Sequence, residues 1–173
     1  MNYYIAQVKT REEEKYIKHF ENLYPESEIN LYFPKKTVRE KVKDKTVIKD
    51  KPLIKGYVIV ECDERIDIRY IIKRFKEASG FIRFLKTNTD VTKLTGQGKE
   101  LVLFFIKHKS TGISKVHYNE NDRIVIEDGV LKGMEGQIIK VDRRRQRAKI
   151  LLDICGASMT FEFSFEVVKQ ITR

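Results

Sequence analysis

The hydrophobic periodicity of the chain changes at a short polar segment, residues 110–114. Before this segment, apolar residues recur at both strand-like and helix-like spacing, and after it only the two-residue period of β-strands is found. Residues 1–107 therefore predict an α+β sandwich with one sheet. Residues 118–173 predict a small five-stranded all-β barrel, and residues 108–117 are assigned to the linker.

The first part of the chain is predicted to alternate strands and helices. Strands are expected over 3–8, 28–33, 53–60 and 81–85, and helices over about 10–24, 63–80 and 98–107. Thr10 and Glu13 have the spacing of a capping box at the start of the first helix.

Residues 35–51 interrupt this pattern. They are rich in lysine and poor in large apolar side chains, so we expect an exposed hairpin or a mobile loop rather than part of a core. Two roles for the segment stay open, a solvated surface and contact with a nucleic-acid backbone.

The second part of the chain contains one basic hairpin. Strands are expected over 123–126, 136–142, 147–154, 158–163 and 169–171. Within 147–154 every second residue is apolar and belongs to the core, so Arg147 and Lys149 are predicted to point outward. Lys140 points outward on the preceding strand if Ile139 and Val141 point inward.

The turn of this hairpin holds three consecutive arginines. Like charges at this density repel one another unless an anion neutralises them, and arginine forks suit phosphates and guanine edges. A solvated loop is the alternative. The candidate RNA-binding residues are Lys140, Arg143, Arg144, Arg145, Arg147 and Lys149.

The charge balance favours a polyanionic partner. The 173 residues include 35 basic and 25 acidic side chains, a net charge of +10. Nucleic acid is preferred to a membrane surface, because no amphipathic helix with a basic face adjoins the arginine turn. The longest apolar run, residues 101–106, is far shorter than the roughly 20 residues that span a bilayer. Cys62 and Cys155 form no disulfide framework, so we expect a cytoplasmic protein with no membrane partner.

Catalytic motifs are missing from the sequence. It has no Cys-x-x-Cys or His-x-x-x-His spacing, no Walker loop and no Gly-x-Ser-x-Gly segment. We therefore predict no enzyme, no cofactor and no metal site.

Two segments carry a family resemblance. Residues 122–139, with Gly129 and Gly133 suited to a tight loop between strands, resemble a KOW motif. Residues 3–8 and 51–60 resemble segments of the NusG N-terminal domain, with Lys55 where the family usually has proline. The likeness covers nearly the whole chain in the right order. It implies a NusG N-terminal type sandwich followed by a KOW, SH3-like barrel.

The resemblance to the NusG superfamily also implies a function. Such a protein is a non-enzymatic transcription factor, expected as a monomer, whose first domain docks on the clamp helices of bacterial RNA polymerase and suppresses pausing. DNA of the transcription bubble is a possible further partner. The polymerase-binding residues implied here are Tyr3, Tyr4, Leu53, Ile54 and Tyr57.

Residues 141–149 resemble a specialised branch, the LoaP antiterminators. This likeness implies read-through of terminators, with recruitment by an RNA hairpin in the nascent leader. A general NusG-type elongation factor and a ribosome- or RNA-associated KOW structural protein are the alternatives. A fold-switching paralogue with a helical second domain is disfavoured by the β-branched and aromatic residues of 147–163.

One turn departs from the pattern of housekeeping NusG proteins. Those proteins carry an aromatic residue and an arginine around a glycine, which contact a ribosomal protein. Here the places hold Cys155, Gly156 and Ala157. Because a missing aromatic anchor removes much of an interface's binding energy, we expect weak coupling to the ribosome, and binding of the factor Rho at the overlapping surface is in equal doubt.

Overall fold

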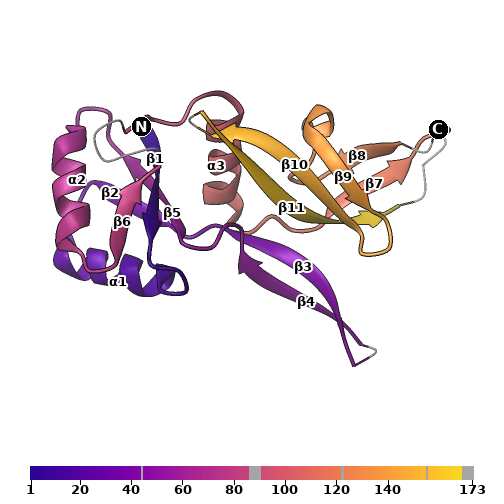
Figure 1. The fold of residues 1–173 in the computed structure, drawn as a ribbon, viewed down its shortest axis with the longest axis horizontal. Coiled ribbons are helices and arrows are strands. Elements are labelled where there is room, and N and C mark those ends of the chain that lie inside the picture. Colours follow the sequence, from indigo (N-terminus) through magenta and orange to yellow (C-terminus); the bar gives the residue numbers. More distant parts are fainter. Residues whose placement is uncertain (44, 86–90, 122, 155, 169–173) are drawn as a thin grey trace. The chain divides into compact units, whose positions relative to one another are not determined.

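The chain folds into two compact units of mixed α+β structure. The computed structural model describes residues 1–43, 45–85, 91–121, 123–154 and 156–168 (Figure 1). The first unit consists of residues 1–34, 54–102 and 154–157, and the second of residues 35–53, 103–153 and 158–173. Each unit is therefore assembled from three separate stretches of chain.

The first unit contains a four-stranded sheet. Its strands are β1 (Asn2–Val8), β2 (Ile29–Tyr32), β5 (Tyr57–Cys62) and β6 (Phe81–Phe84), in the order β2-β5-β1-β6. Each neighbouring pair is antiparallel. The predicted strands 3–8, 28–33 and 81–85 are confirmed within two residues.

Helices α1 (Glu13–Leu23) and α2 (Ile68–Glu77) cover one face of this sheet (Figure 1). Phe20 of α1 and Phe75 of α2 are buried, and their ring centroids lie 5.0 Å apart. They belong to the same core cluster as Tyr4, Ala6 and Val8 on β1. Burial of these apolar residues is the main stabilisation of the first unit.

The capping box expected at α1 does not form. The Glu13 side chain is buried, and its Oε1 accepts a hydrogen bond from the backbone N–H of Gly56 at 2.6 Å. Gly56 has a φ of +80°, and a Cβ at this position would lie 2.8 Å from Thr10 Oγ1. Because the chain turns at Gly56, the strand expected over 53–60 begins only at Tyr57.

The second unit contains a curled five-stranded sheet. Its strands are β7 (Ser114–Tyr118), β8 (Ile124–Asp128), β9 (Ile138–Asp142), β10 (Arg147–Ile154) and β11 (Ala157–Val167), in the order β8-β7-β11-β10-β9. A short 3-10 helix, η1 (Glu135–Gln137), occupies the expected start of β9. Strand β7 begins inside the range 108–117 assigned to the linker. The strand expected over 169–171 lies outside the described residues.

Helix α3 (Gly96–His108) leads from the first unit into the second and matches the helix predicted over 98–107. Among the described residues, no helix combines the length and the apolar character that crossing a membrane requires.

The alternation predicted for β10 is confirmed, but that of β9 is not. Ala148, Ile150, Leu152 and Ile154 are all buried. On β9, however, Ile139 is 56% exposed instead of pointing inward. The pairing of β9 with β10 shifts register between Lys149 and Ile150, and such a bulge turns an intervening side chain outward.

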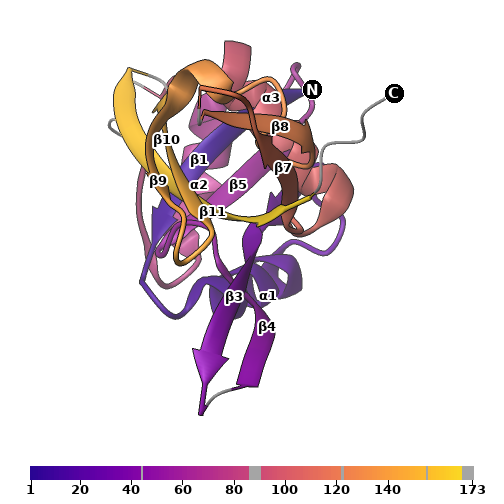
Figure 2. The same cartoon turned by 90° about the vertical axis from the view of Figure 1, so that its right-hand side faces the viewer.

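Residues 35–53 form a separate two-stranded hairpin within the second unit. Strands β3 (Lys35–Val42) and β4 (Lys45–Pro52) are antiparallel and pair from end to end (Figure 2). The expectation of a hairpin is thus confirmed. One of its side chains, Val38, is nevertheless 3% exposed.

Candidate nucleic-acid interface

The turn between β9 and β10 presents three arginines to solvent. Asp142 Oδ1 accepts the backbone N–H of Arg145 at 2.9 Å, and Gln146 adopts a left-handed φ of 52°. The carbonyl of Gln146 accepts the N–H of Phe165 on β11 at 2.9 Å, which ties the turn to the sheet. We call residues 143–147 the arginine turn.

The side chains of the arginine turn differ in how firmly they are held. The Arg143 guanidinium lies over the Tyr118 ring, 4.5 Å from its centroid. Arg145 Nε is 3.9 Å from Asp142 Oδ2, but both side chains are well exposed, so this pair contributes little. Arg144 is also exposed. These side chains can reach an external anion.

Arg147 is held by two carboxylates. Its Nη1 lies 3.0 Å from Glu162 Oε1 and its Nη2 3.9 Å from Glu40 Oε1. Its side chain is only 22% exposed, and its Nε finds no hydrogen-bond partner among the described residues. Arg147 thus points away from the core, as the alternation predicts, but these contacts leave it less open to solvent than an outward position alone would imply. The guanidinium reaches Glu162 on β11, 15 residues away in sequence, and Glu40 on β3, which is much farther away.

Lys140 and Lys149 face each other across β9 and β10. Lys140 is exposed, as predicted, whereas Lys149 is half-buried. Both stand on the same side of the β9–β10 pair as Arg147, because side chains alternate along a strand.

The β3–β4 hairpin contacts the arginine turn. Arg39 Nη1 donates to Gln146 Oε1 at 2.7 Å, and Arg39 Nη2 lies 3.3 Å from Glu166 Oε2. Lys36 Nζ donates to the backbone carbonyl of Glu162 at 3.0 Å. Burial lowers the pKa of Lys36. The sequence does not single out Arg39 and Lys36. It shows only that residues 35–51 are basic, and not which of these cations contact the β10–β11 region.

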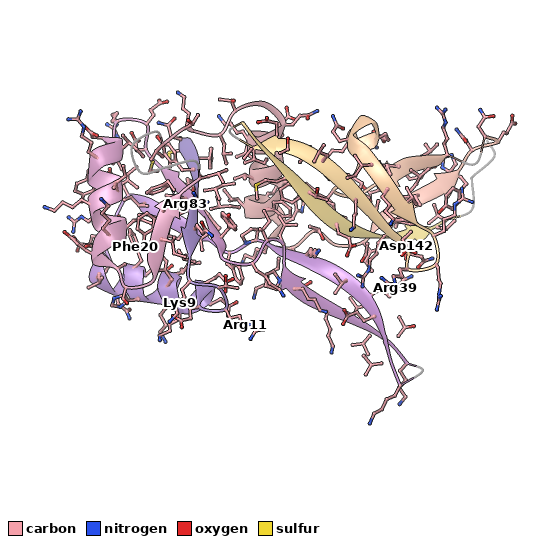
Figure 3. All side chains as sticks on the ribbon, viewed as in Figure 1. Lys9, Arg11, Phe20, Arg39, Arg83 and Asp142 are labelled. Carbon is pink, nitrogen blue, oxygen red and sulfur yellow. The ribbon has the colours of Figure 1, made fainter. Side chains whose placement is uncertain are left out.

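Beside this contact, the hairpin and the arginine turn line an open groove of about 830 Å³. Figure 3 labels Arg39 on β3 and Asp142 at the end of β9, one residue before the turn. Among the described residues that line the groove, four are arginines and one is an acid. Its lining residues are Arg39, Glu40, Thr46, Ile48, Arg144, Arg145, Gln146 and Arg147.

The acid of the groove is itself paired. Glu40 forms a salt bridge with Lys51, and the hydrogen bond from Lys51 lowers the pKa of Glu40. A groove that has several arginines, and whose carboxylate is paired with a lysine, attracts phosphates. Among the described residues no cluster of His, Cys, Asp and Glu is placed to hold a metal ion.

The residues expected to bind polymerase lie mostly inside the structure. Tyr3, Tyr4 and Leu53 are buried, whereas Ile54 and Tyr57 are half-exposed. Tyr4 belongs to the helix-covered core. Tyr3 donates a hydrogen bond to Glu61 Oε1 at 2.9 Å. Burial, and to a smaller extent this hydrogen bond, raise the pKa of Tyr3. Only Ile54 and Tyr57 offer a partner appreciable side-chain surface.

The turn expected to lack a ribosomal contact is described only in part. Cys155 lies outside the described residues, Gly156 is exposed and Ala157 is half-buried. Weak coupling to the ribosome therefore stays a prediction.

Comparison with known proteins gives a consistent set of relatives. Residues 1–101 match the family model described as "Transcription termination factor nusG". The "Transcription termination/antitermination protein NusG" of Borreliella burgdorferi is 23% identical over 149 residues, covering 83% of this chain and 81% of that protein. The protein of the same name from Rickettsia felis is 22% identical over 145 residues, covering 82% of this chain and 72% of its own. A solved structure, "Domain interaction in Thermotoga maritima NusG", has 13% identity and a TM-score of 0.49, with 94% of this chain and 93% of that chain covered.

Proposed function

We propose that this chain, which belongs to the NusG family of transcription termination and antitermination factors, is a processive antitermination factor. In this proposal the first unit binds RNA polymerase, and the second, as a KOW-type domain, binds a hairpin in the nascent leader RNA. Terminators downstream of that hairpin are then read through. Such a factor works beside the polymerase, so we propose a cytoplasmic monomer.

The observation that carries the proposal is the exposed arginine turn. Arg144 and Arg145 project from a turn that is fixed by Asp142 and by the sheet beneath it. Arginine forks can bridge two phosphate oxygens or read a guanine edge. The deep, narrow major groove of A-form RNA excludes side chains, so base reading requires a bulge, loop or mismatch that opens it.

An RNA-binding measurement tests this assignment. We expect Arg144→Ala and Arg145→Ala each to weaken binding to a bulged RNA hairpin by roughly tenfold, with much weaker binding of a perfect duplex by every variant. If about four cations meet phosphates, log affinity against log salt should slope at roughly −3, and each substitution should reduce that slope by about 1.

Arg123→Ala is the matched control for these variants, since it removes one exposed arginine from the same unit outside the turn. If Arg123→Ala and the turn variants bind the RNA hairpin with equal affinity, the arginine turn is only a solvated loop and does not bind RNA. Equal affinities for hairpin and duplex would remove the proposed recognition of a distorted stem.

The polymerase assignment is tested with the full chain. Ile54 precedes β5 and Tyr57 begins it, and both are half-exposed, so we expect Ile54→Asp to abolish capture of bacterial RNA polymerase. Ile82→Asp is the control, because Ile82 is 52% exposed on β6 of the same unit. Capture that survives Ile54→Asp would place the docking surface elsewhere.

Transcription in a defined system separates antitermination from general elongation. We expect the chain to raise terminator read-through only on templates whose leader encodes the RNA hairpin, and the double variant Arg144→Ala, Arg145→Ala to lose this effect. A general NusG-type elongation factor is the second candidate. That candidate predicts faster elongation whether or not the hairpin is present.

A further inference from the structure

We propose that one strand of the bound RNA lies in the groove between the β3–β4 hairpin and the arginine turn, so that the hairpin is the second wall of the RNA site. This inference rests on the proposed function, because it gives the path of the RNA at that same site. The ligand class is single-stranded or distorted RNA, with phosphates and bases both in contact.

The two walls of the groove have different chemistry. The turn contributes three arginines, whereas the hairpin contributes one arginine and one acid, Arg39 and Glu40, beside two residues that carry no charge, Thr46 and Ile48. An RNA strand has the same two sides, a row of phosphates and a row of bases. Single-stranded nucleic acid is commonly bound by this combination of positive charge with apolar contacts to the bases.

Ile48 is an apolar side chain of the groove that is largely exposed to solvent. It is 60% exposed on β4, in a hairpin that is otherwise dominated by charged side chains. Since Ile48 stands directly opposite Arg39 in the β3–β4 register, one base or ribose could contact the Ile48 side chain while Arg39 lies beside its phosphate.

The arginines of the groove divide into fixed and adjustable ones. Arg39 is held by Gln146 and Glu166, and Arg147 is held by Glu162. Such pre-positioned cations lose little conformational freedom when an anion arrives. Arg144 and Arg145 are exposed and can close on phosphates after the strand has entered.

The one lining acid does not prevent this arrangement. Glu40 is paired with Lys51 and approached by Arg147, so its charge is already offset within the protein. Among the described lining residues, Arg39 and Arg147 are likewise offset by Glu166 and Glu162, so the positive charge that an RNA strand meets comes mainly from the exposed Arg144 and Arg145.

The closing experiment places one negative charge in the groove and one outside it. Ile48→Glu and Val42→Glu both replace an exposed apolar residue of the same hairpin, 60% and 43% exposed, but only Ile48 lines the groove. Full-length variants are titrated with a bulged RNA hairpin at 150 mM salt, where charges farther than about 8 Å are largely screened. We expect Ile48→Glu to weaken binding by about tenfold and Val42→Glu by less than about twofold.

Arg144→Ala in the same titration separates failure of this inference from failure of the proposed function. If Arg144→Ala weakens binding while Ile48→Glu and Val42→Glu behave alike, the RNA contacts the turn only, and the second wall is wrong. If none of the three changes affinity, both the RNA site and the groove are wrong. If Ile48→Glu reduces terminator read-through without changing RNA affinity, the groove belongs to a protein partner and the inference is overturned.

A second measurement does not depend on these substitutions. RNA with 4-thiouridine in the bulge, irradiated in complex with the wild-type chain, should cross-link to peptides from residues 45–52 as well as from the arginine turn. Cross-links confined to the arginine turn would contradict a strand lying between two walls. Circular dichroism and thermal unfolding of each variant verify that the fold is intact.

Discussion

The second unit contains two hairpins that are both rich in basic residues but differ in how they are held. The β9–β10 hairpin alternates apolar and polar residues, and every apolar residue of β10 except Leu151 is buried. The β3–β4 hairpin has no such alternation, yet Val38 is buried and Arg39 is bound to Gln146 and Glu166. One hairpin is placed by its core face, and the other chiefly by charged contacts at its side.

Two arginines in one hairpin show how much these placements matter. Arg145 and Arg147 are two residues apart, but Arg145 is 71% exposed in its side chain and Arg147 only 22%. The difference comes from carboxylates on β3 and β11, which reach Arg147 and not Arg145. A cluster of like charges in a sequence can thus contain members that are held by carboxylates and members that stay exposed to solvent.

The largest expected effect comes from breaking the apolar attachment of the β3–β4 hairpin. Val38→Asp places a charge in a buried position, so we expect it to lower the free energy of unfolding by about 3 kcal/mol and to expose residues 35–53 to proteases. Val42→Asp, on the same strand but 43% exposed, is the control. Urea unfolding of both variants measures the effect, and equal losses would show that the hairpin needs no buried anchor.

The next largest effect distinguishes the two arginines of the turn. We expect Arg147→Ala to lower stability by about 1–3 kcal/mol, because it leaves Glu162 in a half-buried position without its cation. Arg145→Ala should change stability by less than about 0.5 kcal/mol, since its side chain is exposed. Thermal unfolding measures both changes in stability. An Arg147→Ala variant as stable as the wild type would mean that the two carboxylate contacts of Arg147 contribute nothing to stability.

The smallest expected effect is a pH dependence at Glu40. The hydrogen bond from Lys51 holds the pKa of Glu40 below its ordinary value of 4.5 in the folded chain. A lowered acid pKa stabilises the folded state above the unfolded pKa, and this contribution is lost as the pH falls through the folded value. Wild type should therefore exceed Glu40→Gln in thermal stability at pH 7, and the gap should close below pH 4.5. A stability difference between wild type and Glu40→Gln that does not change with pH would show that ionisation of Glu40 does not contribute to stability.

The sequence allows correct prediction where the pattern is local. Short stretches of sequence predict the helix over 98–107 and the strand over 147–154 from residue spacing, and the hairpin character of 35–51 from composition. The burial of Ala148 and Ile150 follows from the same alternation. The arginine turn is likewise visible because its three arginines are consecutive.

The remaining features depend on residues far apart in the chain. Glu13 looks like a helix cap, but its partner is the backbone of Gly56, 43 residues away. Ile139 turns outward because the register of a neighbouring strand shifts, and no local pattern encodes that bulge. Strand β7 begins within the predicted linker, because residues 110–114 look like a polar connection in sequence, whereas Ser114 is fully buried in the fold. The groove itself needs Arg39 beside Gln146, a contact that no short window of sequence contains.

The assembly of the second unit from distant stretches also sets an order of events during synthesis. Arg39 leaves the ribosome 107 residues before its partner Gln146. At elongation rates of about 5–20 residues per second, the β3–β4 hairpin exists for roughly 5–20 s before the arginine turn has been made. A lone two-stranded hairpin is marginally stable in water, so its strands open and close during that interval. The proposed RNA site is therefore among the last parts of the nascent chain to form, after the sheet of the first unit has been available for several seconds.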